Sequence, residues 1–149
     1  MAYGKRVCTF ILVMCFLGLS ACQTHLYKRA ELGQTEDGWR TIKVDSLTRH
    51  TKEDSIGVMY LRMADATIEQ KKNIFVVRDM SGKSFDQYLV TYTYNVETNR
   101  DYTGKIYKLQ AEFKPIAQKE FEDYLGMKVY DAHRIVEKYG YLRHEPGTS

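Results

Sequence analysis

Cysteine and histidine are the residues of this chain that could act as nucleophiles or metal ligands, and they are few. The three cysteines, Cys8, Cys15 and Cys22, all lie near the N-terminus. The histidines include no pair at the i, i+4 spacing of a helical metal site, and no His-Glu-x-x-His or Cys/His pattern occurs. These histidines are His25, His50, His133 and His144. The sequence therefore predicts no metal ion and no cofactor.

The motifs of common enzyme classes are missing from the sequence as well. It contains no Gly-x-Ser-x-Gly motif of a serine hydrolase and no glycine-rich phosphate loop. Glu120, Glu122 and Asp123 could act together as acid and base, but a solvated helix face is the commoner role for such a group. The sequence favours a protein that is not an enzyme. It leaves open a hydrolase site assembled from residues that lie far apart in the chain.

The first 21 residues have the composition of a secretory signal peptide. Lys5 and Arg6 form a positive start, and residues 7–17 form an apolar stretch. That stretch is shorter than the roughly 20 residues with which a helix spans a bilayer. We therefore expect residues 1–21 to be a lipoprotein signal peptide that is cleaved off, as the residues around the cleavage point indicate.

Those residues, Leu19-Ser20-Ala21-Cys22, resemble the bacterial lipobox. The resemblance implies that the Cys22 sulfur receives a diacylglycerol, that cleavage falls just before Cys22, and that the new amino group is acylated, for example with palmitate. A thiolate is a nucleophile well suited to take up a lipid near neutral pH. Gln23 follows, where Asp would retain the protein at the inner membrane of enteric bacteria. The resemblance therefore implies an outer-membrane lipoprotein on the periplasmic face.

The length and composition predict one globular domain behind this anchor. The chain has 149 residues, of which 44% are hydrophobic and 28% charged, with a net charge of +3. Such a small positive excess argues against a nucleic-acid partner. Residues 22–37 are mostly polar, and we expect them to be a lipidated tether. Residues 38–149 are expected to form the domain. No disulfide is expected in it, because Cys8 and Cys15 leave with the signal peptide and Cys22 carries the lipid.

The first half of the domain shows one helix pattern between two strand patterns. Alternation predicts a strand over residues 39–45. Thr51 can cap a helix over residues 52–71, whose Met and Tyr stripe is more typical of core packing than of a ligand surface. The apolar run Ile74–Val77 predicts a buried strand, and residues 79–83 have the composition of a turn that ends it.

The second half has the pattern of a β-hairpin followed by helices. Residues 88–96 and 107–113 alternate around a polar loop at 98–104. A short helical turn is expected at 120–125, and a helix at 130–139 that Gly140 ends. The predicted fold is therefore α+β: an antiparallel-rich sheet of about four strands, with two helices packed on one face.

This order of motifs resembles an uncharacterised family of small bacterial lipoproteins. In that family a lipobox and tether precede an Arg-containing strand, a helix, a buried strand, a β-hairpin and a terminal Tyr-Asp-Ala helix. The matching segments are Trp39–Ile42, Leu61–Thr67, Phe75–Val77 and Tyr130–Arg134. His133 stands where Arg is usual, and Lys71-Lys72 replaces a Gly. The resemblance implies the fold order and the envelope location, and it implies no activity.

Tyrosine is the one residue type whose abundance points to recognition. Tyr88, Tyr92 and Tyr94 are expected on one strand face, and Tyr107 on a partner face. Such a surface could bind an envelope protein or cell-wall glycan, because Tyr offers area, a hydroxyl and little entropy loss. The alternative is that these rings pack beneath the helices and stabilise the sheet.

The sequence therefore leads to a hypothesis with two alternatives. The first is a lipid-anchored envelope lipoprotein that acts as a non-enzymatic binding or assembly module. The membrane is one partner, through the lipid on Cys22, and an envelope protein or cell-wall glycan is the other. The alternatives are an envelope hydrolase with a dispersed site and a surface exclusion lipoprotein of a mobile element.

Overall fold

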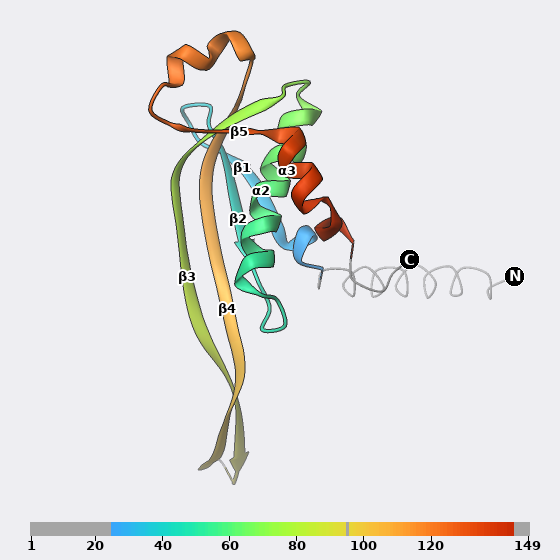
Figure 1. The fold of residues 1–149 in the computed structure, drawn as a ribbon. Helices are drawn as coiled ribbons and strands as arrows, with labels where there is room; N and C mark the ends of the chain where they lie inside the picture. The colour runs from blue at the N-terminus through green and yellow to red at the C-terminus, as the bar shows by residue number, and fades with distance from the viewer. Residues whose placement is uncertain (1–24, 95, 145–149) are drawn as a thin grey trace, which may run out of the picture.

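The computed structural model describes residues 25–94 and 96–144. The predicted signal peptide and Cys22 lie outside the described residues. Within them the fold is α+β, with one antiparallel sheet in the order β1-β2-β4-β3-β5 (Figure 1). The strands are β1 (Ala30–Gln34), β2 (Arg40–Asp45), β3 (Ile74–Thr93), β4 (Val96–Ile116) and β5 (Lys128–Asp131). The α-helices are α2 (Lys52–Glu69) and α3 (Ala132–Tyr139), and the 3-10 helices are η2 (Leu26–Arg29), η3 (Gln118–Tyr124) and η4 (Gly140–Arg143).

The two α-helices lie together on one face of the sheet (Figure 1). Helix α2 begins where predicted, because the Thr51 hydroxyl accepts a hydrogen bond from the Asp54 N–H at 3.0 Å. Its Met stripe is buried, with Met59 and Met63 almost fully removed from solvent. The prediction that this stripe packs in the core is confirmed.

The core lies mainly between the helices and the sheet. Phe75 of β3 and Phe113 of β4 are fully buried there, with ring centroids 6.1 Å apart in an edge-to-face arrangement. Because side chains alternate along a strand, Val76 points to the opposite face. A second, smaller cluster forms there with Trp39 and Ile116. Both faces of the central strands are therefore covered near the helices.

Two aspects of the predicted fold are wrong in detail. The sheet has five strands rather than about four, because Lys128–Asp131 pairs with Ile74–Val77 as β5. The tether does not extend to residue 37, because Ala30–Gln34 pairs with β2 as the edge strand β1. Leu26 and Ala30 are buried in the core. Few apolar residues are needed in a short edge strand, so the polar composition of this segment concealed its role.

The hairpin is much longer than the alternation predicted. The segment 79–83 is not a turn: Asp79 has a φ of 51°, and a bulge between Arg78 and Ser81 bends β3 without ending it. The segment 98–104 is not a loop either. It lies within β4, which pairs with β3 up to Thr93 and Val96. Strands β3 and β4 thus have 20 and 21 residues.

Bulges explain why segment 98–104 resembles a loop in sequence. Register shifts leave Thr98 and Thr103 without a directly opposed residue in β3. Their hydroxyls donate to the carbonyls of Thr91 and Gln87 at 3.0 and 2.9 Å. Gly104 has a φ of 136°, which favours glycine at the second bulge. Polar residues are tolerated here because the strands are exposed.

A polar cluster ties both ends of the described chain to helix α2. The Asp65 carboxylate accepts a hydrogen bond from the Tyr27 hydroxyl of η2 at 2.5 Å. The same carboxylate accepts two from the guanidinium of Arg143 in η4, one of them from Nε at 3.1 Å. Arg62 donates to the Tyr27 hydroxyl at 3.2 Å and lies over the Tyr27 ring. This cluster holds the residues that follow the predicted anchor against the body.

Candidate functional site

The far part of the hairpin extends past the helices as a two-stranded arm (Figure 1). We define the arm as Ser81–Thr93 of β3 and Val96–Tyr107 of β4. Strand β5 pairs with β3 only as far as Val77, and β2 pairs with β4 only from Lys108 onward. In the part of the chain that the structure describes, no third strand pairs with the arm. At about 3.3 Å per residue, the arm is roughly 40 Å long.

The arm exposes large apolar and aromatic side chains to solvent. Tyr92 is 63% exposed and Leu89 is 60% exposed. The Tyr88 and Tyr102 rings contact each other edge to face, with centroids 5.6 Å apart. The Arg100 guanidinium lies 4.5 Å from the Tyr88 centroid. Further exposed side chains on the arm are Phe85, Tyr94 and Val96. Such a concentration of exposed apolar surface is typical of an interaction site.

The tip of the arm carries a tyrosine in an unusual backbone conformation. Tyr94 has a φ of 53° and is 96% exposed, in the turn between Thr93 and Val96. This left-handed region favours Gly or Asn and is strained for a bulky side chain. A strained, fully exposed aromatic residue suggests a role in contact with another molecule.

The four predicted tyrosines do not form one surface. Tyr88 and Tyr92 lie on the same face of β3, as expected from their even spacing. Tyr94 lies in the turn. Tyr107 lies at the base of the arm, half-buried, where its backbone exchanges hydrogen bonds with Ser46 at 2.7 and 2.9 Å. The sequence missed Tyr102, because its segment resembled a loop.

Tyrosines outside the predicted set of four pack within the body. The Tyr60 hydroxyl lies 3.1 Å from that of Tyr130, and burial, with that hydrogen bond, raises the pKa of Tyr60. The Tyr130 ring stacks on Phe75 at 5.5 Å, and the Tyr139 ring stacks on Tyr60 at 6.5 Å. The body tyrosines therefore have a structural role that the arm tyrosines lack.

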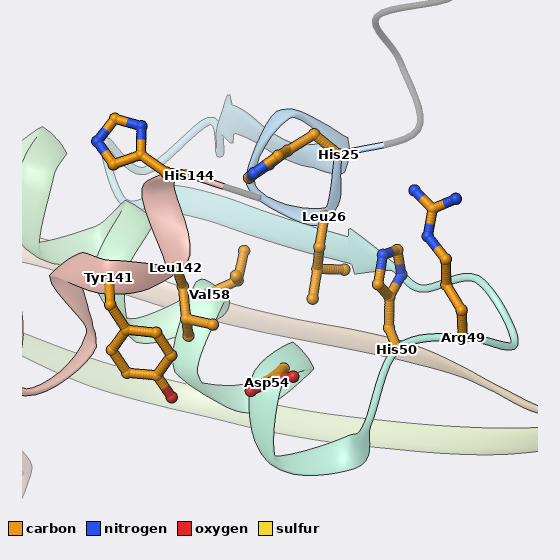
Figure 2. Close-up of a pocket in the computed structure, with 9 residues that line it drawn as sticks. All are labelled: His25, Leu26, Arg49, His50, Asp54, Val58, Tyr141, Leu142 and His144. Atoms are coloured by element: carbon orange, nitrogen blue, oxygen red, sulfur yellow. The ribbon is translucent and has the colours of Figure 1, made fainter. Parts of the chain in front are cut away.

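A second candidate is a pocket of about 560 Å³ beside the start of α2 (Figure 2). Its apolar walls are Leu26, Val58 and Leu142. Its polar lining comes from distant parts of the chain and consists of His25, Arg49, His50, Asp54, Tyr141 and His144. The structure thus brings three of the four histidines together, although their spacing gave no sign of it.

Hydrogen bonds give two of these histidines structural roles. The ring Nδ1 of His50 accepts from the Leu47 backbone N–H at 2.9 Å, and the backbone N–H of His50 donates to the Leu47 carbonyl at 3.0 Å. The His25 Nδ1 accepts from the Tyr27 N–H at 3.2 Å and caps η2. In both rings the Nδ1 lone pair is used in a hydrogen bond and is therefore not open to a metal ion. Burial first, then Arg49 and Arg29, lower the pKa of His50 and favour its neutral form.

The three carboxylates that the sequence analysis considered as an acid and base group do not line this pocket. Within residues 25–94 and 96–144, no three His, Cys, Asp or Glu side chains are placed to bind one metal ion. Glu120 accepts from the Ala117 N–H at 2.6 Å and caps η3, while Glu122 and Asp123 are exposed. None of the helices described is both long and apolar enough to cross a membrane.

Comparisons with protein-family models, with curated proteins and with solved structures find no significant match to this chain. The resemblance to small bacterial lipoproteins therefore stays a prediction from the sequence motifs.

Proposed function

We propose that this protein is a bacterial envelope lipoprotein that acts as a non-enzymatic binding or assembly module. In this proposal Cys22 carries the diacylglycerol and holds the domain at the periplasmic face of the outer membrane. The arm then binds an envelope protein or cell-wall glycan. The lipobox pattern supports the anchor, and the exposed aromatic arm is the observation that carries the binding function.

The arm supports a binding function because Ser81–Thr93 contributes no side chain to the buried core. That core is built from the helices, from β1 and β2, and from the near ends of β3 and β4. An extension of roughly 40 Å with exposed Tyr92 and Tyr94 adds apolar surface in contact with water, which is unfavourable for a free monomer. Contact with a partner would remove that surface from water.

The anchor and the arm would act together. The first core residue, Leu26, follows Cys22 by only a few positions, and the cluster around Asp65 fixes Tyr27 of this segment to α2. A short connection would confine the domain to a thin layer along the membrane. Such confinement raises the effective concentration of the arm for a partner in the same layer.

In-cell crosslinking tests the proposed binding function. The full chain would be expressed in a bacterial envelope, crosslinked, purified and analysed by mass spectrometry. We expect a dominant envelope protein or attached glycan with the native chain, and at least a tenfold loss with Tyr92→Ala combined with Tyr94→Ala. Tyr141→Ala is the matched control, because Tyr141 is 66% exposed but lies on the body. Equal recovery with the arm variant and this control would refute the proposed function.

The anchor is tested separately with Cys22→Ala. The variant should accumulate as an uncleaved or unlipidated precursor, because it lacks the sulfur that would take the lipid. Labelling with palmitate measures this directly. Normal labelling of Cys22→Ala would rule out the lipobox assignment without affecting the binding proposal.

A further inference from the structure

One edge of the arm is open for strand pairing over its full length. The carbonyls of Gln87 and Thr91 are directed to β4, since the Thr103 and Thr98 hydroxyls bond to them. Backbone groups alternate in direction along a strand, so those of the even-numbered residues are directed to the free edge. These residues are Gly82, Ser84, Asp86, Tyr88, Val90 and Tyr92. The two register shifts along Ser81–Thr93, at Gln87/Tyr88 and Thr91/Tyr92, have their extra residue in β4, so β3 itself carries no inserted residue there.

The two edges of the arm differ in a way that points to pairing on the β3 side. The β4 edge is interrupted by bulges at Thr98 and Thr103 and carries four charged residues, features that prevent strand addition. The β3 edge is regular, and after Asp86 it carries no charge up to Thr93. A long, regular and uncharged edge is a template for another strand.

The β3 edge is also complementary to itself. A two-fold axis through Gln87 pairs Ser81–Thr93 antiparallel with the same segment of a second copy. Ser81 then faces Thr93, and every residue of the segment has a directly opposed partner. In this register Phe85 faces Leu89 of the second copy, and Tyr92 faces Gly82, whose missing side chain leaves room for the ring. No like charges face each other, because Lys83 faces Thr91 and Asp86 faces Tyr88. Moving the axis to Asp86 would oppose two carboxylates.

The body leaves space for this pairing. Strand β5 occupies the same edge of β3 only along Ile74–Val77. The tip of a second arm, after its Thr93, would end beside Ser81, short of β5. The resulting sheet would contain four strands at the arm. Two strands alone are marginally stable in water, whereas three or more strands with an apolar face can be stable.

We propose that two copies of this chain pair antiparallel through Ser81–Thr93 of β3, with the two-fold axis at Gln87. This inference rests on the proposed function of the arm as a docking element and names one partner for it, a second copy. The pairing gives Phe85, Leu89 and Tyr92 of each copy a cross-strand neighbour from the other copy, and it leaves the faces of the arm and the tip residue Tyr94 outside the paired edge.

Charge substitutions at the axis test this pairing in the full chain. Gln87 is exposed, and its partner in β4 is Gly104, so Lys or Glu fits there in a single copy. In the dimer, Gln87→Lys or Gln87→Glu would place two like charges directly opposite each other. Each variant alone should weaken the dimer at least about tenfold. A mixture of the two should restore it, because only a self-paired position places Lys opposite Glu.

The measurement is sedimentation of the full chain purified in detergent, with the native chain expected to be dimeric at micromolar concentration. Thr93→Lys and Thr93→Glu are matched controls, because Thr93 has the same orientation as Gln87 but faces Ser81. Both controls should remain dimeric. A monomeric native chain, a dimer that survives both Gln87 variants, or a lost dimer that mixing does not restore would each overturn the inference.

A cysteine substitution keeps the test decisive if the charge variants do not fold. Gln87→Cys would meet itself at a non-hydrogen-bonded pair, where the side chains are closest. It should give a disulfide-linked dimer in the envelope, whereas Thr93→Cys should not. A crosslink with Thr93→Cys and none with Gln87→Cys would overturn the inference. If the native chain forms no dimer but still recovers an envelope partner, the inference fails and the proposed function stands. If the dimer forms but partner recovery is unchanged in Tyr92→Ala combined with Tyr94→Ala, the proposed function fails and the dimer stands.

Discussion

Asp65→Ala should be among the most destabilising substitutions of a charged residue in this protein. The Asp65 carboxylate accepts three hydrogen bonds, one from the Tyr27 hydroxyl and two from the Arg143 guanidinium. Its side chain is 13% exposed, whereas that of Arg143 is 36% exposed. The hydrogen bond to Asp65 is the largest cause of the raised pKa of Arg143. The residue therefore joins η2, α2 and η4 at one point.

The magnitude follows from the partners and their exposure. A hydrogen bond to a charged group contributes about 1.5–3 kcal/mol, and bonds within one network are not additive. Arg143 can rehydrate after the change because a third of it is exposed, so its share is reduced by solvent screening. The Tyr27 hydroxyl, which is half-buried, would lose its carboxylate acceptor. We expect Asp65→Ala to lower the free energy of unfolding by about 2–3 kcal/mol.

Urea unfolding followed by circular dichroism measures this cost. A double-mutant cycle of Asp65→Ala with Arg143→Ala should give a coupling energy of about 1 kcal/mol, and a cycle with Tyr27→Phe a similar value. Limited proteolysis should also cut near Leu26 sooner in Asp65→Ala, because η2 loses its attachment to α2. A cost below about 0.5 kcal/mol, with no coupling to either partner, would refute the role assigned to the cluster.

Three further predictions concern stability. The hydrogen bond from Thr35 first, and then that from Arg78, lower the pKa of Asp37 to about 2. The stability that this carboxylate contributes above about pH 4 should therefore be lost as the pH falls toward 2. Asp37→Asn should remove that part of the pH dependence of Tm. Because the pKa of His50 is lowered, this imidazole binds a proton less readily in the folded state than in the unfolded state. The free energy of unfolding should therefore fall as the pH drops below about 6.5. Urea unfolding across that pH range should show a smaller fall for His50→Gln. Leu61→Ala, at a fully buried position, should lower the free energy of unfolding by about 2–5 kcal/mol. Leu125→Ala, at a position 72% exposed, should change it by no more than about 0.5 kcal/mol. Equal changes in thermal unfolding would contradict the assigned core.

The sequence was informative where one face of an element is buried. The helix start at Thr51 and the buried run Ile74–Val77 were predicted correctly, since capping and hydrophobic patterns are local. The second half of β5, Tyr130 and Asp131, was assigned to the following helix, because Lys128–Asp131 is short and its pairing with β3 is a contact between distant segments. Local patterns do not contain such a contact.

The arm was the harder part to predict for a different physical reason. Its strands expose both faces, so the alternation at residues 88–96 marks no buried face and does not show where the strand ends. Segment 98–104 is rich in Thr, Asn, Asp and Gly, and these residues usually indicate a loop. Here two threonine hydroxyls and Gly104 accommodate bulges instead. The histidine pocket was equally hidden, because His25, His50 and His144 come to line one pocket only through the tertiary fold.

The direction of the arm depends on how its strands leave the core. Val77 is still buried, and Arg78 is fixed on the opposite face by Glu112 at 2.6 Å and by the Trp39 ring at 4.1 Å. The bulge follows at once, with Asp79 at a φ of 51°. An ion pair and a ring contact therefore hold the residue just before the bend. If the arm binds a partner as we propose, these contacts at its base set the direction in which the arm leaves the sheet toward that partner.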